Sequence, residues 1–277
     1  LVKSIVVFAL LALWPAGLEA RWKIPGYVRQ WQVLDTVHFR IHYPRGDEEL
    51  ALLAARFAEE AHARFRRVLR KPTREVIPVF VFASTQDFAA GNILPATVGE
   101  NVGGFSDFFR RRVVVPFAGD YASFRHVLAH EIAHAFQFQI LPGPFYNAYP
   151  LWLLEGMCEY LTLGWDQATE AYVRDLVLHN RLPRLSDLNQ GRVRRGYDFY
   201  KVGQAVLWYM AQEWGEERIG HFLKELGATG DLNVAFRSSF ELSPEEFEIR
   251  WLAFLEERYA PARAALIQQQ DPRSRIV

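Results

Sequence analysis

The stretch RHVLAHEIAHAFQFQ (residues 125–139) places two histidines and a glutamate inside an otherwise apolar segment. His130 and His134 are four residues apart, so on a helix they lie on one face, about 6 Å apart along the axis. Two neutral imidazoles at this spacing can reach one tetrahedral Zn²⁺ ion, and Glu131 can then act on a water molecule at an open coordination position. The pattern therefore predicts a metal site with a general base.

The alternative is a buried helix that happens to carry polar residues. Apolar residues fall on several sides of the stretch, so the helix should be buried: Val127, Leu128, Ile132, Ala133 and Ala135. Two imidazoles and a carboxylate in such a helix are costly unless they are hydrogen-bonded or bound to a metal. This context favours the metal site over the alternative.

A third ligand is required if zinc is to keep one position open for water. Gln137 and Ile140 stand where the metzincin pattern would have glycine and histidine, which excludes that pattern. Glu155 and Glu159 follow in WLLEGMCEY (152–160), again four residues apart and so on one helical face. Glu155 lies in an apolar context and is the candidate third ligand; the alternative is a salt-bridged helix residue.

Composition excludes several classes of protein. The 277 residues carry a formal net charge of zero, which argues against a nucleic-acid partner or an anionic membrane surface. Cys158 is the only cysteine, so neither an internal disulfide nor a zinc site built from cysteines is possible. We interpret Cys158 as a packing residue.

The first twenty residues have the pattern of a secretory signal. Lys3 precedes an apolar run that is too short to span a bilayer, and cleavage is expected near Ala20. An uncleaved N-terminal anchor is the alternative, and this segment is the one predicted membrane contact. The sequence therefore predicts export to the periplasm, the envelope or the medium.

Residue patterns divide the remaining chain into a β-rich first half and a helical second half. Strand patterns occur at 37–43, 75–84 and, as a pair around a polar turn, 103–117. Helical patterns occur at 47–70, 125–139, 152–163, 168–180, 200–215 and 243–259. The sequence predicts an α+β fold with the site where the halves meet, one domain over residues 21–260 and a tail over 261–277.

HEIAH followed by PLWLLEGMCEY resembles the gluzincin metallopeptidases. It is most similar to exported bacterial proteins of that aminopeptidase-like superfamily, which carry H-E-x-x-H and then P-x-W-x-x-E-G-x-A-E-Y. The resemblance implies a zincin-like fold, with His130, His134 and Glu155 as zinc ligands and Glu131 as general base. It also implies that Glu159 orients a ligand histidine. Cys158 replaces the family's usual alanine, another small residue.

The resemblance extends over residues 35–258 and implies further site residues. Tyr200, in YKVGQAVLWYMAQEWGEE, matches a tyrosine that points at the substrate carbonyl; Tyr197 is the second choice, and a core aromatic is the alternative. Gly103, Gly104 and Phe105 match the edge strand along which such enzymes hold an extended peptide. The G-x-M-E-N motif of aminopeptidases is missing, which favours an endopeptidase or an unknown peptide substrate. His126 is interpreted as a core histidine or one supporting the ligands.

Together these features predict an exported zinc-dependent peptidase with one zinc ion per chain and a peptide or protein as substrate. One alternative keeps the metal but makes the chain a hydrolase of a non-peptide amide. The other is a catalytically inactive zincin that acts as a binding or scaffold module, and the presence of Glu131 counts against it.

Overall fold

The computed structural model describes residues 30–71, 73, 75–91, 103–107, 110–141, 149–192 and 196–270. The predicted leader at residues 1–20 lies outside these ranges. The chain divides into two compact units. The first comprises Leu1–Arg67 with Lys71–Gln139, and the second comprises Val68–Arg70 with Ile140–Val277. The assignment of residues 21–260 to a single peptidase domain stays a prediction.

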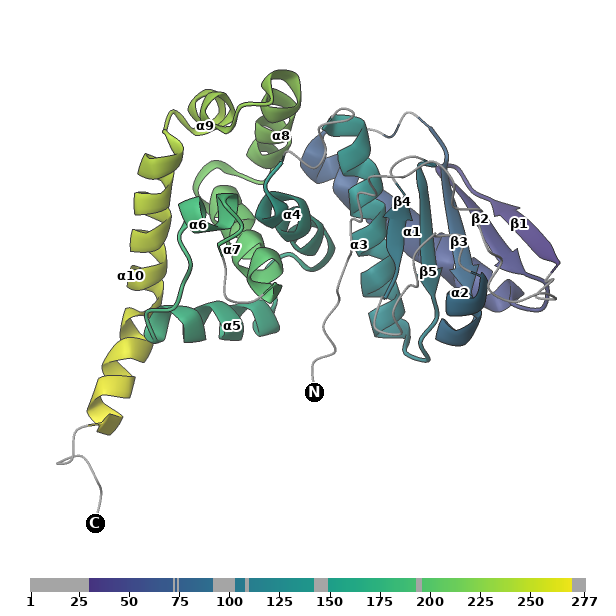
Figure 1. The fold of residues 1–277 in the computed structure, drawn as a ribbon, viewed down its shortest axis with the longest axis horizontal. Helices are drawn as coiled ribbons and strands as arrows, with labels where there is room; N and C mark the ends of the chain where they lie inside the picture. Colours follow the sequence, from purple (N-terminus) through teal and green to yellow (C-terminus); the bar gives the residue numbers. More distant parts are fainter. Residues whose placement is uncertain are drawn as a thin grey trace, which may run out of the picture. The chain divides into compact units, whose positions relative to one another are not determined.

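The first unit is built around a five-stranded mixed sheet (Figure 1). Its elements are β1 (Trp31–Asp35), β2 (Phe39–Pro44), α1 (Glu48–Leu69), β3 (Ile77–Phe82), α2 (Thr85–Gly91), β4 (Phe105–Asp107), β5 (Arg112–Pro116) and α3 (Tyr121–Ile140). The strand order is β1-β2-β3-β5-β4. The three inner strands are parallel, and β1 and β4 join them antiparallel. Among the described strands, β4 is therefore an edge strand.

Alternating side chains decide which face of the sheet receives the long helices. Ile77, Val79 and Val81 of β3 are buried on one face. On the same face, Phe39 of β2 meets the ring of His62 on α1, and His62 lies 5.3 Å from the ring of Phe136 on α3. Helices α1 and α3 therefore pack together against this face. On the opposite face, Phe88 of α2 packs with Phe82, Phe105 and Val114.

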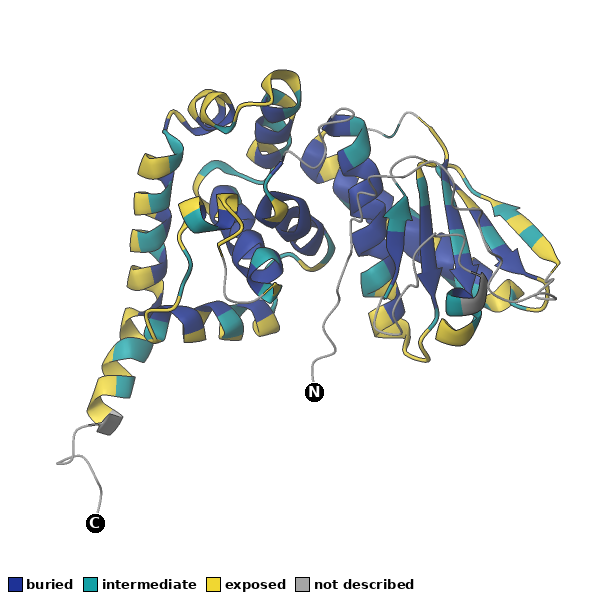
Figure 2. Ribbon diagram, in the orientation of Figure 1, coloured by how far each residue is buried: buried dark blue, intermediate teal, exposed yellow. Residues whose placement is uncertain are grey.

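The described residues of the second unit form helices and their connections, with no strand among them. Its helices are α4 (Leu151–Leu163), α5 (Gln167–Leu178), α6 (Leu185–Asn189), α7 (Tyr197–Trp214), α8 (Glu217–Thr229), α9 (Leu232–Phe240) and α10 (Pro244–Gln270). Helices α4 and α7 form its centre, and Figure 2 shows both as largely buried. No helix in the described ranges is long and apolar enough to cross a membrane.

Two glycines bring the backbones of α4 and α7 into direct contact. A Cβ on Gly203 would collide with the carbonyl oxygen of Trp152, and a Cβ on Gly156 would collide with the backbone of Gly203. Because no side-chain rotation can relieve a clash with backbone, only glycine fits at either position. This close approach fixes the distance between the helices that carry Glu155, Glu159 and Tyr200.

Gly203→Ala is therefore expected to lower the free energy of unfolding by about 3 kcal/mol, the upper end of the usual cost of overpacking. Urea denaturation of the purified protein measures this loss. Gly196→Ala is the matched control, because a Cβ there meets no atom within 4 Å. Equal stability of the two variants would contradict the proposed packing of α4 on α7.

The predicted α+β class is confirmed, with a sheet in the first unit and helices in the second. The predicted strands and helices are all present, and most lie within a few residues of their expected bounds. The helix predicted at 243–259 is the exception, because α10 continues to Gln270 and includes the first ten residues of the predicted tail at 261–277. Five elements were not predicted: β1, α2, α6, α8 and α9. Helices α2 and α6 have only 7 and 5 residues, too few to produce a clear helical period. Gly220 inside α8 and Gly230 before α9 interrupt the pattern there.

Candidate functional site

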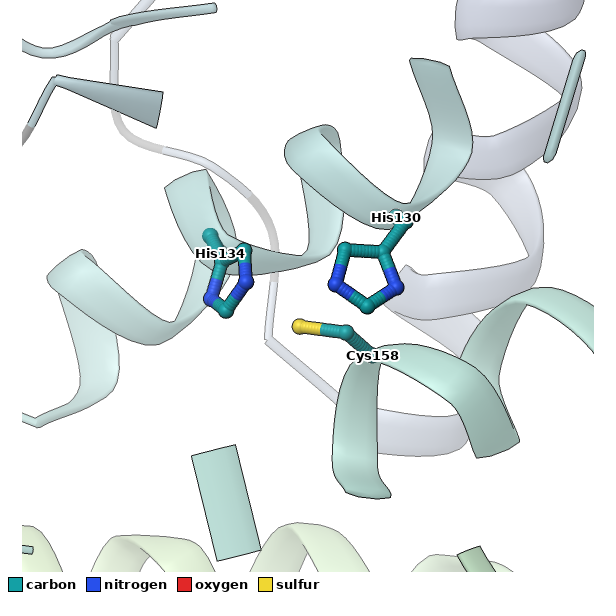
Figure 3. Close-up of side chains that lie close together, drawn as sticks. All are labelled: His130, His134 and Cys158. Carbon is teal, nitrogen blue, oxygen red and sulfur yellow. The ribbon is translucent and has the colours of Figure 1, made fainter. Parts of the chain in front are cut away.

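Helix α3 carries the two histidines and the glutamate of the H-E-x-x-H pattern at buried positions. His130, Glu131 and His134 are exposed by only 2%, 1% and 4%. The imidazole rings of His130 and His134 have their centroids 5.0 Å apart, with 72° between the ring planes. Figure 3 shows both rings projecting from the same side of α3. The predicted one-face arrangement of the histidine pair is present.

A glutamine one turn further along α3 selects the proton position on His134. Nδ1 of His134 lies 3.0 Å from Oε1 of the fully buried Gln137. Because an amide oxygen can only accept, Nδ1 carries the proton and Nε2 keeps its lone pair. Metal-binding histidines commonly have this arrangement, with the non-ligating nitrogen donating to an oxygen. The donor chemistry of the helix thus fits a Zn²⁺ ion, whose ligands are neutral imidazoles and carboxylates.

The edge strand β4 is joined to α3 beside Glu131. The hydroxyl of Ser106 donates to the main-chain oxygen of Glu131 over 2.7 Å. A Cβ on Gly104 would lie 2.9 Å from Cγ1 of Val127, and one on Gly103 would lie 3.3 Å from Cγ2 of the same valine. The two glycines thus let the chain pass close to α3. Packing alone explains them, and their substrate-binding role stays a prediction, as does that of Phe105.

Outside the histidine pair of α3, His38 and His62 form a second possible metal-binding group of the first unit, together with Glu59. The rings of His38 and His62 stack face to face with centroids 3.6 Å apart. Nδ1 of His38 lies 2.7 Å from Oε2 of Glu59, and burial lowers the pKa of His62 to about 4. His126 is half-buried, and its ring lies 6.2 Å from that of His130.

In the second unit, both predicted carboxylates lie on α4. Glu155 and Glu159 are exposed by only 3% and 2%. Cys158, labelled on α4 in Figure 3, is completely buried, as the packing interpretation requires. Burial of two carboxylates on one helix requires strong partners for both.

Tyr200 lies in the first turn of α7 and is buried, with 8% of its surface exposed. Its ring stacks near that of Tyr197 at a centroid distance of 6.4 Å. Burial raises the pKa of Tyr197 above its usual value, despite the opposing charge of Lys201. Both tyrosines therefore remain candidate hydrogen-bond donors on the helix that packs against α4.

The sequence interpretation missed Lys201, which is buried beside Glu159. Its Nζ lies 2.5 Å from Oε2 of Glu159 and 3.1 Å from Oε1 of Gln204. The amide nitrogen of Gln204 donates to the main-chain oxygen of Gly164 and to Asp166. Burial raises the pKa of Asp166, but hydrogen bonds from Thr169 and the charge of Lys201 lower it below the usual value. The sequence contained one indication of this pair, the lysine inside the apolar stretch YKVGQAV. A lysine in such a stretch is expected to be buried, and buried lysines almost always have a partner.

The structure thus groups His130, Glu131 and His134 in the first unit, and Glu155, Glu159 and Tyr200 in the second. Each group lies on one helix or on two helices in contact. The complete set of three zinc ligands stays a prediction.

No family model matches the chain. An uncharacterized protein of Bacillus subtilis (strain 168), YhcO, is 24% identical over 129 residues, which are 45% of this chain and 39% of that protein. Among solved structures, an M1 zinc metallopeptidase from Deinococcus radiodurans and a mutant form of it are each 16% identical, with TM-scores of 0.46. They cover 80% of this chain, which spans only 51% of the wild-type protein and 52% of the mutant.

Proposed function

We propose that this chain is a zinc-dependent peptidase whose zinc ion is held by His130, His134 and Glu155. The observation that carries the proposal is the buried histidine pair of α3, in which Gln137 leaves Nε2 of His134 with its lone pair. Two imidazoles and a carboxylate form a common ligand set of catalytic zinc. Buried imidazoles and carboxylates on α3 and α4 are difficult to explain by packing alone.

The remaining residues have separate roles in this proposal. A bound zinc ion would polarise the scissile carbonyl and lower the pKa of a water molecule toward 7. Glu131, next to His130 in the chain, takes the proton of the attacking water and passes it to the leaving amine. Tyr200 donates a hydrogen bond to the oxygen that gains negative charge. Glu159 orients a ligand histidine.

A peptide is the proposed substrate because the sheet offers an edge for it. Strand β4 pairs with β5 on one side, and among the described strands it has no neighbour on the other. An extended peptide can add to such an edge through main-chain hydrogen bonds. Gly103, Gly104 and Phe105 would line the beginning of this edge. The sequence lacks the aminopeptidase motif that would bind the free amine of a substrate. We propose an endopeptidase acting outside the cytoplasm.

The test is hydrolysis of casein and of a mixed peptide library by purified protein. We expect cleavage that 1,10-phenanthroline abolishes and added Zn²⁺ restores. Cleavage of simple amides without cleavage of peptides would favour the non-peptide hydrolase. A folded protein that binds zinc and peptides but cleaves none of them would favour the scaffold module.

A further inference from the structure

The buried ion pair between Lys201 and Glu159 joins two helices of the second unit. The side chains are exposed by only 4% and 3%, and Nζ lies 2.5 Å from Oε2. A carboxylate taken out of water is stable as an anion only when a cation or hydrogen bonds replace its hydration. Lys201 supplies both to Glu159 from the neighbouring helix α7.

The position of the lysine is itself fixed by a network of hydrogen bonds. Gln204, one turn along α7, accepts from Nζ of Lys201 through Oε1 over 3.1 Å. Its amide nitrogen is anchored 2.8 Å from the oxygen of Gly164 and 2.9 Å from Oδ2 of Asp166. Asp166 caps the start of α5 by accepting from Ala168 and Thr169. The ends of α4 and α5 thus hold the ammonium group in one place.

We propose that Lys201 is a positioning residue of the metal site, which acts through Glu159. The inference rests on the proposed function, in which Glu159 orients a ligand histidine. Lys201 fixes one carboxylate oxygen through a charge-assisted hydrogen bond, so that the carboxylate holds a single orientation. Outer partners of this kind typically change metal affinity about 10–100-fold when they are removed.

The test compares zinc affinities by competition with a chelator of known affinity, at a temperature well below unfolding. Lys201→Met should weaken zinc binding about 10–100-fold, and Glu159→Gln should do the same. Lys201→Arg keeps the positive charge and should restore most of the affinity. Adding Lys201→Met to Glu159→Gln should change the zinc affinity by less than about threefold, because the effects of substituting residues that act through one another are not additive.

Arg258→Met is the matched control, since it removes another ion pair of the same unit, between Arg258 of α10 and Glu170 of α5. It should leave zinc affinity unchanged. Zinc affinity of Lys201→Met equal to that of the wild type, with only its thermal stability lowered, would show a purely structural role and overturn the inference. Absence of zinc from folded wild type would instead overturn the proposed function.

If Lys201→Met alone does not fold, the comparison is made between Glu159→Gln and the double variant, which leaves no uncompensated charge. Equal zinc affinity supports the inference. A further tenfold loss in the double variant overturns it, because Lys201 would then act independently of Glu159.

Discussion

Glu131→Gln is expected to lower the rate of peptide hydrolysis by about 10²–10⁴-fold while the protein keeps its fold and its zinc. In the proposed mechanism this carboxylate moves the proton from water to the leaving amine, and an amide cannot accept that proton. Glutamine has nearly the same shape, so the buried position on α3 should tolerate it. The main-chain oxygen of Glu131, which accepts from Ser106, is unaffected by the change.

The measurement is kcat on a cleaved peptide, together with the zinc content of the same preparation. Glu60→Gln is the control, since Glu60 is an exposed glutamate of the same unit that pairs with Arg125. It should retain full activity. Wild-type turnover by zinc-loaded Glu131→Gln would show that another group moves the proton and that the assigned role is wrong.

His134→Ala is expected to abolish zinc retention, and with it all hydrolysis. Removing one of three protein ligands leaves too few donors to hold the ion through dialysis. The hydrogen bond from Nδ1 to Gln137 would also be lost, so a decrease in stability is expected even without zinc. Metal analysis after dialysis against a chelator measures the retention.

His126→Ala provides the comparison for this variant. His126 lies on the same helix, two turns before His134, and is half-buried. Its removal should leave one zinc ion bound. Loss of zinc from His126→Ala, combined with retention by His134→Ala, would show that a different pair of histidines holds the metal.

The sequence was most informative where the spacing and the types of neighbouring residues indicated the same structure. Spacing of four placed His130 and His134 on one face of α3, and the β-branched and aromatic residues at 75–84 predicted strand β3 correctly. The edge position of β4 was also expected, and the strand order confirms it for the described residues. Local patterns were sufficient for the histidine pair and for β3 because each depends on residues close together in the chain, whereas the edge position of β4 was implied by the resemblance.

Features that depend on distant partners were not predicted. Lys201 pairs with a glutamate 42 residues earlier, and Ser106 bonds to a carbonyl 25 residues later. The contact of Gly156 with Gly203 likewise arises only when α4 meets α7. Each glycine has its partner on another helix, so the pairing of Gly156 with Gly203 appears only in three dimensions.

The most direct test of the central claim is the zinc content of the wild-type protein, measured by native mass spectrometry and by elemental analysis. We predict one zinc ion per chain, with higher thermal stability in the zinc-loaded form than in the metal-free form. A folded wild-type protein that contains no zinc, and gains no stability when Zn²⁺ is added, would contradict the account.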